Sequence, residues 1–248
     1  MNGASIFLFN KIIEQVLTLA RQGNIEKADE LTRSFVRKIY YEEVKNWDLN
    51  RKISFIENVT GGLGFRFHNI CDMESMVHVG MYISWADVVK DGYSIFEIGT
   101  GLGRTMYCIF LKAKPSLYVS CDINPYMLAI ALFDNPVSEF QEILWKSCVK
   151  ILLCDGVRLA YALPYSPNHV VHDGGPCPRD NPRLYADHFI KRLIEITKQE
   201  GTLSIFAGKD RWWVNKIYNV VKSVELIREV RTVSVPGSGI CVIHVRRK

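Results

Sequence analysis

The chain has 248 residues, 48% of them hydrophobic, and a formal net charge of +5. This length and apolar content suffice for one large hydrophobic core, alone or with a small appendage, and the charge permits an anionic partner without requiring one. The seven cysteines include no C-x-x-C pair and no cluster with histidine at zinc-ligand spacing, which excludes a zinc site of that kind and favours a reducing, cytoplasmic compartment.

Two amphipathic helices are predicted at the N-terminus. Apolar residues recur at helical spacing over residues 4–22, Gly23 interrupts them, and a second run follows over residues 25–46. Polar residues such as Lys11 break the first apolar run, which is therefore neither a signal peptide nor a membrane span. We interpret residues 1–48 as a helical hairpin that packs on the rest of the chain, forms a lid, or forms a homodimer contact.

Residues 49–92 form a linking segment with a less regular pattern. The glycine run at residues 61–64, followed by residues 65–68, predicts a turn before a short strand. Residues 74–89 have a helical pattern and lead into the next strand. We expect this segment to separate the hairpin from a domain formed by residues 93–248.

The most informative stretch runs from Ser94 to Thr105 and reads S-I-F-E-I-G-T-G-L-G-R-T. A short apolar strand, a glycine turn and a helix start are typical of the first unit of a doubly wound nucleotide-binding sheet. The spacing departs from the dinucleotide pattern G-x-G-x-x-G, because Arg104 stands where the third glycine is expected. Glu97 before the turn would repel a pyrophosphate, whereas it suits a ligand with an ammonium group. A tight turn without a ligand is the alternative.

From this stretch onward, strands and helices alternate. The alternation predicts an α/β fold with a doubly wound parallel sheet and a C-terminal β-hairpin. The further strands are predicted at residues 117–121, 149–154, 169–172 and 202–206 and on both sides of residues 236–239, and helices at 106–112, 126–133, 184–198 and 210–221.

Four successive predicted strands end in a carboxylate: Glu97, Asp122, Asp155 and Asp173. Ligands of open parallel sheets bind at the carboxyl ends of the strands. Helix capping alone would explain some of these aspartates. Four negative charges along one edge favour a ligand that compensates them.

The Ser94 to Thr105 stretch resembles motif I of the class I S-adenosyl-L-methionine (SAM) dependent methyltransferases, and the later motifs extend the resemblance to the end of the chain. The resemblance implies a Rossmann-like sheet of seven strands that binds SAM. Glu97 would reach the methionine ammonium, Asp122 the ribose hydroxyls, and Asp155 the adenine amino group. The other implied cofactor contacts come from the glycine turn and from the residues after two strands: Gly99, Thr100, Gly101, Leu102, Gly103, Ile123 and Gly156.

The catalytic residue predicted for methyl transfer is Asp173. The reaction is an in-line displacement at a sulfonium, and a carboxylate at this strand end can orient an acceptor N–H or O–H and take its proton. Strand alternation turns His172 to the opposite face, which favours a structural role for it. Tyr185 is a second candidate, expected to help close the site.

The loop after His172 departs from the N-P-P-Y pattern of enzymes that methylate exocyclic amines. It is similar to H-D-P-P-R in an archaeal group of predicted methyltransferases, whose L-Y-S-x-x-F-Y and N-P-W-S patterns resemble residues 184–189 and 135–138. The diglycine Gly174-Gly175 in place of diproline changes the stiffness of the loop. It leaves open a catalytically degenerate subunit that binds a partner through the N-terminal helices.

Two other family patterns resemble this loop. Spermidine synthases, which transfer aminopropyl from decarboxylated SAM, carry an aspartate, a G-P and L-[FY]-x-x-x-F at a similar spacing, although Arg104 in this chain would oppose a polyamine. The dipeptide Pro176-Cys177 is similar to motif IV of cytosine-C5 methyltransferases, in which the cysteine thiolate attacks the base.

The C-terminal third is basic, and it contains Trp212 and Trp213 after a predicted strand. These tryptophans either stack a base at the rim of the site or anchor the next helix. We therefore predict a methyltransferase that acts on a nitrogen or oxygen of a small molecule or of RNA, with no membrane partner.

Overall fold

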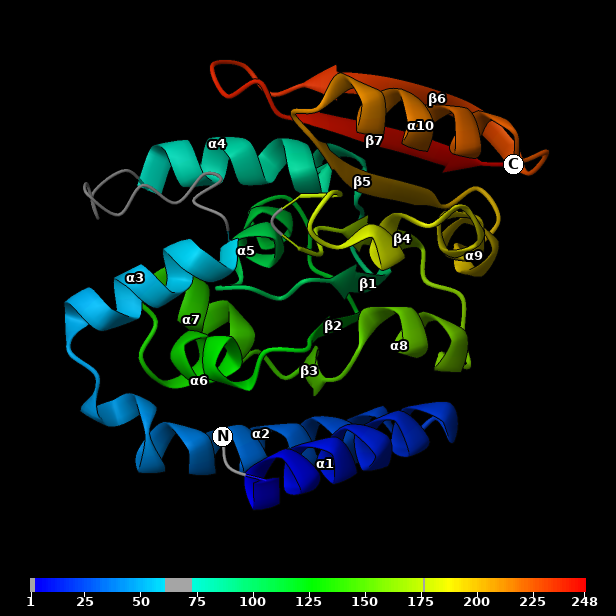
Figure 1. Ribbon diagram of the computed structural model, residues 1–248. Helices are drawn as coiled ribbons and strands as arrows, with labels where there is room; N and C mark the ends of the chain where they lie inside the picture. Colours follow the sequence, from blue (N-terminus) through cyan, green and yellow to red (C-terminus); the bar gives the residue numbers. More distant parts are fainter. Residues whose placement is uncertain (1–2, 61–72, 176) are drawn as a thin grey trace.

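A twisted seven-stranded sheet forms the centre of the computed structural model, which describes residues 3–60, 73–175 and 177–248 (Figure 1). The strand order is β3-β2-β1-β4-β5-β7-β6. The first five strands are parallel, and β7 runs antiparallel between β5 and β6, which confirms the predicted fold class. The strands are β1 (Ser94–Ile98), β2 (Leu117–Asp122), β3 (Val149–Leu153), β4 (His169–His172), β5 (Thr202–Gly208), β6 (Ile227–Ser234) and β7 (Cys241–Arg247).

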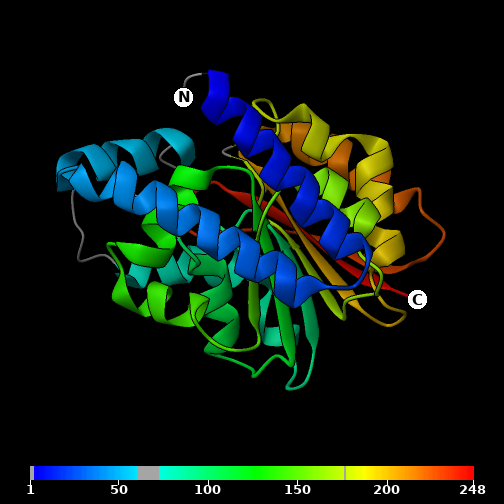
Figure 2. The same cartoon turned by 90° about the horizontal axis from the view of Figure 1, so that it is seen from below.

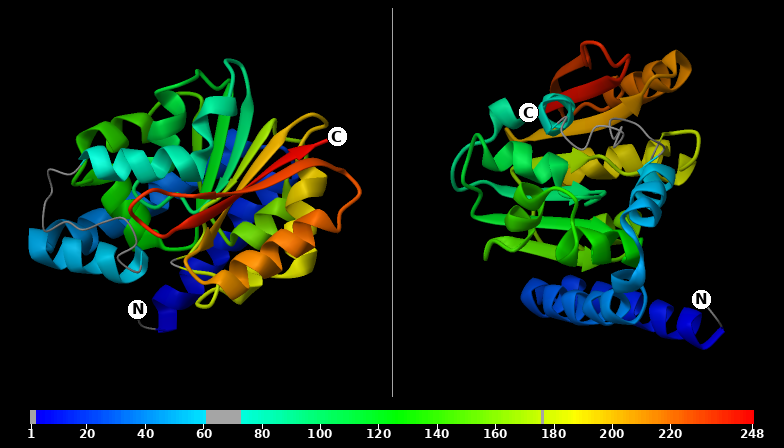
Figure 3. Two further views of the ribbon diagram at one scale, coloured as in Figure 1. Left: turned by 90° about the horizontal axis from the view of Figure 1, so that it is seen from above. Right: turned by 90° about the vertical axis from the view of Figure 1, so that its left-hand side faces the viewer.

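Helices cover both faces of the sheet, because strands β1 to β5 are apolar and buried along nearly their whole length. The first set of helices packs on one face and the second on the other (Figure 3). The first set is α4 (Met73–Ser84), α5 (Arg104–Phe110), α6 (Pro125–Phe133) and α7 (Ser138–Leu144), and the second is α8 (Gly156–Ala162), α9 (Asp187–Ile196) and α10 (Arg211–Lys222).

The predicted strands agree with the structure, and the helices agree in part. The predicted helix at residues 184–198 is divided into a 3₁₀ turn, Pro182–Tyr185, and α9. The pattern did not predict α3 (Leu49–Thr60), α7 or α8. The turn and strand predicted at residues 61–68 lie outside the described residues.

The N-terminal hairpin covers the β3 edge of the sheet. It consists of α1 (Gly3–Arg21) and α2 (Ile25–Glu42), which lie side by side across that edge (Figure 2). Asp29 of α2 accepts a hydrogen bond from the backbone N–H of Ile151 at 2.8 Å, and the Thr32 hydroxyl accepts one from Leu153 N–H at 3.0 Å. These side chains replace the partner that an edge strand lacks. The domain boundaries at residues 48 and 92 stay a prediction.

Helix α3 bridges from the hairpin to the carboxyl ends of the strands. Trp47, Phe55 and Tyr126 form an aromatic cluster that fixes α3 on α6, with ring centroids 5.3 to 6.2 Å apart. Lys52 of α3 also pairs with Asp134 at the end of α6. None of the helices in the described ranges combines the length and apolar content needed to cross a membrane.

The Asp29 contact predicts a measurable stability loss. Replacing Asp29 by Ala leaves the buried N–H of Ile151 without its acceptor and removes the 2.7 Å ion pair with Arg33. We expect the free energy of unfolding to fall by about 1–3 kcal/mol, measured by urea denaturation. The exposed neighbour Glu30→Ala is the control and should change stability by less than about 0.5 kcal/mol. Equal effects of both substitutions would contradict the capping role of Asp29.

Candidate functional site

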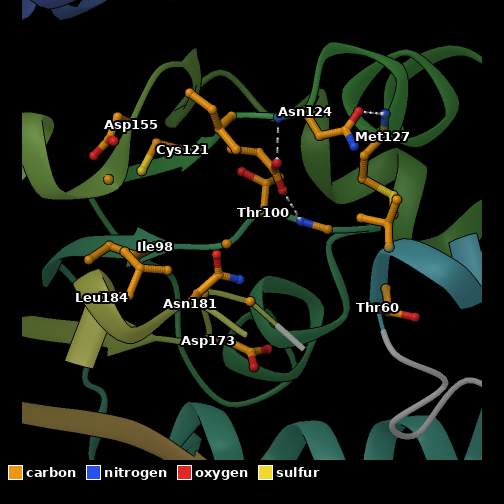
Figure 4. Close-up of a pocket in the computed structure, with 18 of the residues that line it drawn as sticks. Thr60, Ile98, Thr100, Cys121, Asn124, Met127, Asp155, Asp173, Asn181 and Leu184 are labelled. Carbon is orange, nitrogen blue, oxygen red and sulfur yellow. Dashed lines mark hydrogen bonds between the residues drawn. The ribbon is translucent and has the colours of Figure 1, made fainter. Parts of the chain in front are cut away.

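A cavity of about 320 Å³ opens at the carboxyl ends of β1 to β4 (Figure 4). This is the edge where strand order reverses between β1 and β4, which is the usual ligand site of an open parallel sheet. Most of the predicted cofactor residues line it: Gly99, Thr100, Gly101, Leu102, Asp122, Ile123, Asp155 and Gly156, together with Asp173.

The glycine turn needs glycine at Gly99 because two strand ends meet there. Gly99 has φ +92°, and a Cβ on it would lie 2.3 Å from the carbonyl oxygen of Asp173. Gly101 has φ +49°, but a Cβ added to it would meet no atom within 4 Å, so this residue borders open cavity. Gly103 precedes α5, and a Cβ on it would contact Leu144 at 3.2 Å instead. Gly103 therefore starts the helix and lies outside the cavity wall.

Asp122 is held rigidly at the end of β2. Its Oδ2 accepts from Gly101 N–H at 3.1 Å, and its Oδ1 accepts from Asn124 N–H at 2.9 Å. Burial raises the pKa of this carboxyl, while the backbone donors oppose the shift. Ile123 beside it is 49% exposed. The pair presents a hydrogen-bond acceptor next to an apolar surface, as a ribose and a base require.

Asp155 lies at the end of β3 and caps α8. Its Oδ1 accepts from the N–H groups of Val157 at 2.8 Å and Arg158 at 3.1 Å, and its Oδ2 is 3.6 Å from the guanidinium of Arg183. Gly156 follows, where a Cβ would lie 2.6 Å from Ile98 Cγ2. Helix capping therefore accounts for Oδ1 of Asp155, whereas Oδ2 faces the Arg183 guanidinium.

Asp173 sits at the end of β4, opposite the start of α5. Its Oδ2 accepts from the Thr105 hydroxyl at 2.9 Å and lies 3.5 Å from the Arg104 guanidinium. Burial raises the pKa of Asp173, and the contacts with Arg104 and Thr105 reduce that shift. A carboxyl with a raised pKa, held in a cavity, is suited to accept a proton.

Glu97 is fully buried and does not line the cavity. Its Oε2 accepts a hydrogen bond from the Ser120 hydroxyl at 2.6 Å. Burial raises its pKa to about 8, and the nearby Asp173 and Asp122 charges contribute to the increase, against the lowering effect of Ser120 and Tyr118. Glu97 thus stands behind the glycine turn, and its expected contact with a ligand ammonium stays a prediction.

Tyr185 is fully buried and outside the cavity wall. Its hydroxyl donates to the carbonyl oxygen of Gly174 at 3.1 Å, and its ring packs on His172 with centroids 4.6 Å apart. His172 bonds Leu184 O through Nε2 at 2.7 Å, and burial lowers its pKa to about 4. Both side chains hold the diglycine loop in place, so Tyr185 would act on the position of the loop and would not touch a substrate.

Cys177, Trp212 and Trp213 do not line the cavity. Cys177 donates its Sγ–H to Asp180 Oδ2 at 3.1 Å and is not part of the cavity wall, and Pro176 is outside the described residues. Trp213 packs on Tyr185, with ring centroids 6.4 Å apart, whereas Trp212 is 61% exposed. The anchoring interpretation therefore fits Trp213.

Several lining residues have no sequence signal. Val59 and Thr60 reach the cavity from the end of α3, while Asn181 and Arg183 come from the loop before α9. Phe206 of β5 completes the wall. None of these residues belongs to a motif that the sequence shows, and the tertiary fold brings them to this cavity.

Comparisons with known proteins agree with this geometry. No family model matches the sequence, and no curated protein matches it. Among solved structures, the chain is similar to a spermidine synthase from Thermotoga maritima, with a TM-score of 0.55, 14% identity, and coverage of 73% of this chain and 60% of that chain. The chain has the class I methyltransferase fold.

Two methyltransferase structures share this fold. Human methyltransferase-like protein 13, in complex with SAH, has a TM-score of 0.54, 15% identity, and coverage of 69% of this chain and 82% of that chain. Precorrin-6y C5,15-methyltransferase from Geobacter metallireducens has a TM-score of 0.51, 15% identity, and coverage of 68% and 88%. The chain spans only three fifths of the spermidine synthase it matches. At these identities the comparisons establish the SAM-dependent transferase fold and leave the substrate open.

The two turn glycines predict contrasting effects of an added methyl group. Gly99→Ala places a Cβ against backbone that cannot move aside, so unfolding free energy should fall by clearly more than the ~1–2 kcal/mol that a left-handed conformation costs an L-residue. Gly101→Ala has space and should lose only that amount. Thermal denaturation of both variants measures the difference. A Gly99→Ala variant as stable as Gly101→Ala would show that the close approach does not matter.

Proposed function

We propose that the protein is a cytoplasmic SAM-dependent methyltransferase. The observation that carries this proposal is the convergence of Asp122, Asp155 and Asp173 on one cavity beside the glycine turn. The cavity lies where strand order reverses, and its volume falls within the range of small-molecule sites. The fold shared with a methyltransferase in complex with SAH supports the choice of ligand.

Each residue at the carboxyl ends of the strands would contact a different part of SAM. Asp122 would accept hydrogen bonds from the ribose hydroxyls, since two backbone N–H groups already fix its carboxylate. Asp155 would accept from the adenine amino group. Leu102 and Ile123 would flank the adenine ring with apolar surface. When bound, SAM would supply the methyl group on an activated sulfur.

Asp173 would act on the acceptor. The Thr105 hydroxyl donates to Oδ2 at 2.9 Å, which favours one orientation of the carboxylate at the cavity wall. We infer that it orients an acceptor N–H or O–H toward the methyl carbon and takes the proton as the new bond forms. The acceptor would be a small molecule or RNA.

A methyl donor fits this cavity better than decarboxylated SAM. Arg104 lines the cavity and pairs with Asp173, and its guanidinium would also attract a ligand carboxylate. A polyamine acceptor needs several carboxylates, and among the described lining residues only Asp173 remains once Asp122 and Asp155 serve the cofactor. The similarity to spermidine synthase keeps aminopropyl transfer as the second candidate.

The N-terminal helices bear on the remaining alternative. Helix α2 uses Asp29 and Thr32 to cover β3, so part of its surface serves the chain itself. A homodimer contact, or partner binding by a catalytically degenerate subunit, would use the outer surface of the hairpin. Both stay proposals behind the enzymatic interpretation.

The donor assignment predicts binding. Isothermal titration calorimetry should give tight binding of SAM and S-adenosylhomocysteine (SAH) and weaker binding of decarboxylated SAM. Asp122→Ala should weaken SAH binding by about tenfold to a hundredfold, because each hydrogen bond to a charged group contributes about 1.5–3 kcal/mol.

A surface aspartate gives the matched control. Asp87 is exposed and pairs with Lys112 far from the cavity, so Asp87→Ala should bind SAH like the unmodified protein. Preference for decarboxylated SAM would favour aminopropyl transfer. Failure of all these ligands to bind would overturn the cofactor assignment.

The base assignment predicts a separation of binding from turnover. Asp173→Asn keeps the side-chain shape, so SAH affinity should stay within a few-fold, while transfer of labelled methyl from SAM to fractionated cell RNA and metabolites should fall by at least ~100-fold. Since burial raises the pKa of Asp173, the rate should decline as pH falls through that raised value and the base becomes protonated. Unchanged turnover in Asp173→Asn would exclude this role.

A further inference from the structure

Two hydroxyl side chains, Ser120 and Thr100, connect the buried carboxyl of Glu97 to the cavity wall. Glu97 and Ser120 lie directly opposite each other on β1 and β2. Ser120 Oγ is 2.6 Å from Glu97 Oε2 and 2.7 Å from Thr100 Oγ1. Thr100 lines the cavity, whereas Glu97 and Ser120 are fully buried. The contacts form one continuous chain of hydroxyl groups that starts at a carboxyl and ends at the ligand cavity.

The protonation of Glu97 sets the direction of this chain. A carboxylate only accepts hydrogen bonds, so the Ser120 hydroxyl donates to an ionised Glu97, and the Ser120 oxygen must then accept a hydrogen bond from Thr100. Because the single hydroxyl proton of Thr100 is used in this way, its oxygen keeps acceptor capacity only. That polarity suits a ligand cation and disfavours a ligand acceptor.

The surroundings of Glu97 make its negative charge costly in the empty protein. Tyr118 and Asp122 from β2, Asp173 from β4, and Cys108 and Arg104 from α5 are the titratable and charged groups nearby. Two of them are carboxylates, and burial is the largest cause of the raised pKa of Glu97, about 8. Within the described residues, only Oε2 accepts a close hydrogen bond, from Ser120 at 2.6 Å, and the nearby Tyr118 hydroxyl offsets a further part of that cost. A cation placed in the cavity would lower the free-energy cost of the negative charge on Glu97.

We propose that Glu97 is a positioning residue that acts through Ser120 and Thr100, so that binding of a ligand ammonium is linked to loss of the Glu97 proton. This inference rests on the proposed SAM site and specifies how its cationic amino-acid end is recognised. The carboxyl contributes a negative charge when the ammonium arrives and is neutral otherwise, which avoids a permanent cluster of like charges behind the glycine turn.

Titration calorimetry of SAH at pH 7, in buffers of different ionisation enthalpy, measures the linked proton. We expect release of up to about one proton per SAH bound, and an affinity that rises by up to about tenfold per pH unit between about pH 6 and 8. The sign follows because the ligand prefers the ionised carboxyl, which the empty protein populates only as pH approaches 8. 5′-Methylthioadenosine lacks the amino-acid end and should bind without releasing a proton.

Two variants test the path. Glu97→Gln keeps the shape of the side chain but cannot ionise, so SAH should bind it without proton release and with a flat pH profile. Ser120→Ala removes the middle hydroxyl and should also reduce the release. If Glu97 had only a structural role, Glu97→Gln would instead lower the affinity for both ligands equally and leave the proton release on SAH binding unchanged. Urea denaturation of each variant confirms that it folds.

The outcomes separate this inference from the proposed function. If neither SAH nor 5′-methylthioadenosine binds, the SAM site itself is wrong. If both bind and SAH releases no proton, or if Glu97→Gln releases as much as the unmodified protein, the linkage is overturned. If Glu97→Gln abolishes release and Ser120→Ala does not, the charge acts without the hydroxyl chain, and the path through Ser120 is overturned.

Discussion

The approach of Gly99 to the carbonyl of Asp173 is the constraint on which the site depends. A Cβ at Gly99 would lie 2.3 Å from that oxygen, so only glycine lets the end of β1 meet the end of β4. The same approach lets Asp173 N–H donate to Ile98 O at 2.9 Å, which extends the pairing of these strands beyond the sheet proper. Asp173, Thr105 and the glycine turn are thereby fixed relative to one another before any ligand arrives.

This packing concentrates negative charge. Asp122 and Asp173 lie at the ends of β2 and β4, on either side of β1, and burial raises the pKa of each carboxyl. The protein offsets the charge with donors it can hold in place: backbone N–H groups for Asp122, and Thr105 with Arg104 for Asp173. A cationic ligand would add to this compensation, so we expect the site to favour a sulfonium or ammonium over a phosphate.

Much of this arrangement could be predicted from the sequence. Strands β1 to β5 are short apolar runs that end in turn residues, and their order places Asp122, Asp155 and Asp173 at one edge. The short helices α7 and α8 span seven residues each and show too little periodicity to recognise. Thr60 and Arg183 reach the cavity only through tertiary packing.

The position of Glu97 shows a subtler limit. Its place before the glycine turn correctly identifies an acidic residue near the cavity, but strand geometry puts it two residues, about 6–7 Å, behind Gly99. At that depth the neighbouring elements, β2 among them, cover it completely. A motif therefore specifies the type of residue and its neighbours, while burial decides whether that residue touches the ligand.

The cover that α2 forms over the edge of β3 bears on where a stable fragment of this protein can begin. At the opposite edge, β6 protects itself with charged residues such as Arg228, Glu229 and Arg231. Strand β3 has one charged residue, Lys150, which is buried and pairs with Glu26 of α2, and its outward N–H groups rely on Asp29 and Thr32. A fragment that lacks α1 and α2 would expose β3 as an unpaired edge strand, which can pair with other chains. The hairpin thus shields the edge of β3, and we expect a stable fragment of this protein to include residues before β1.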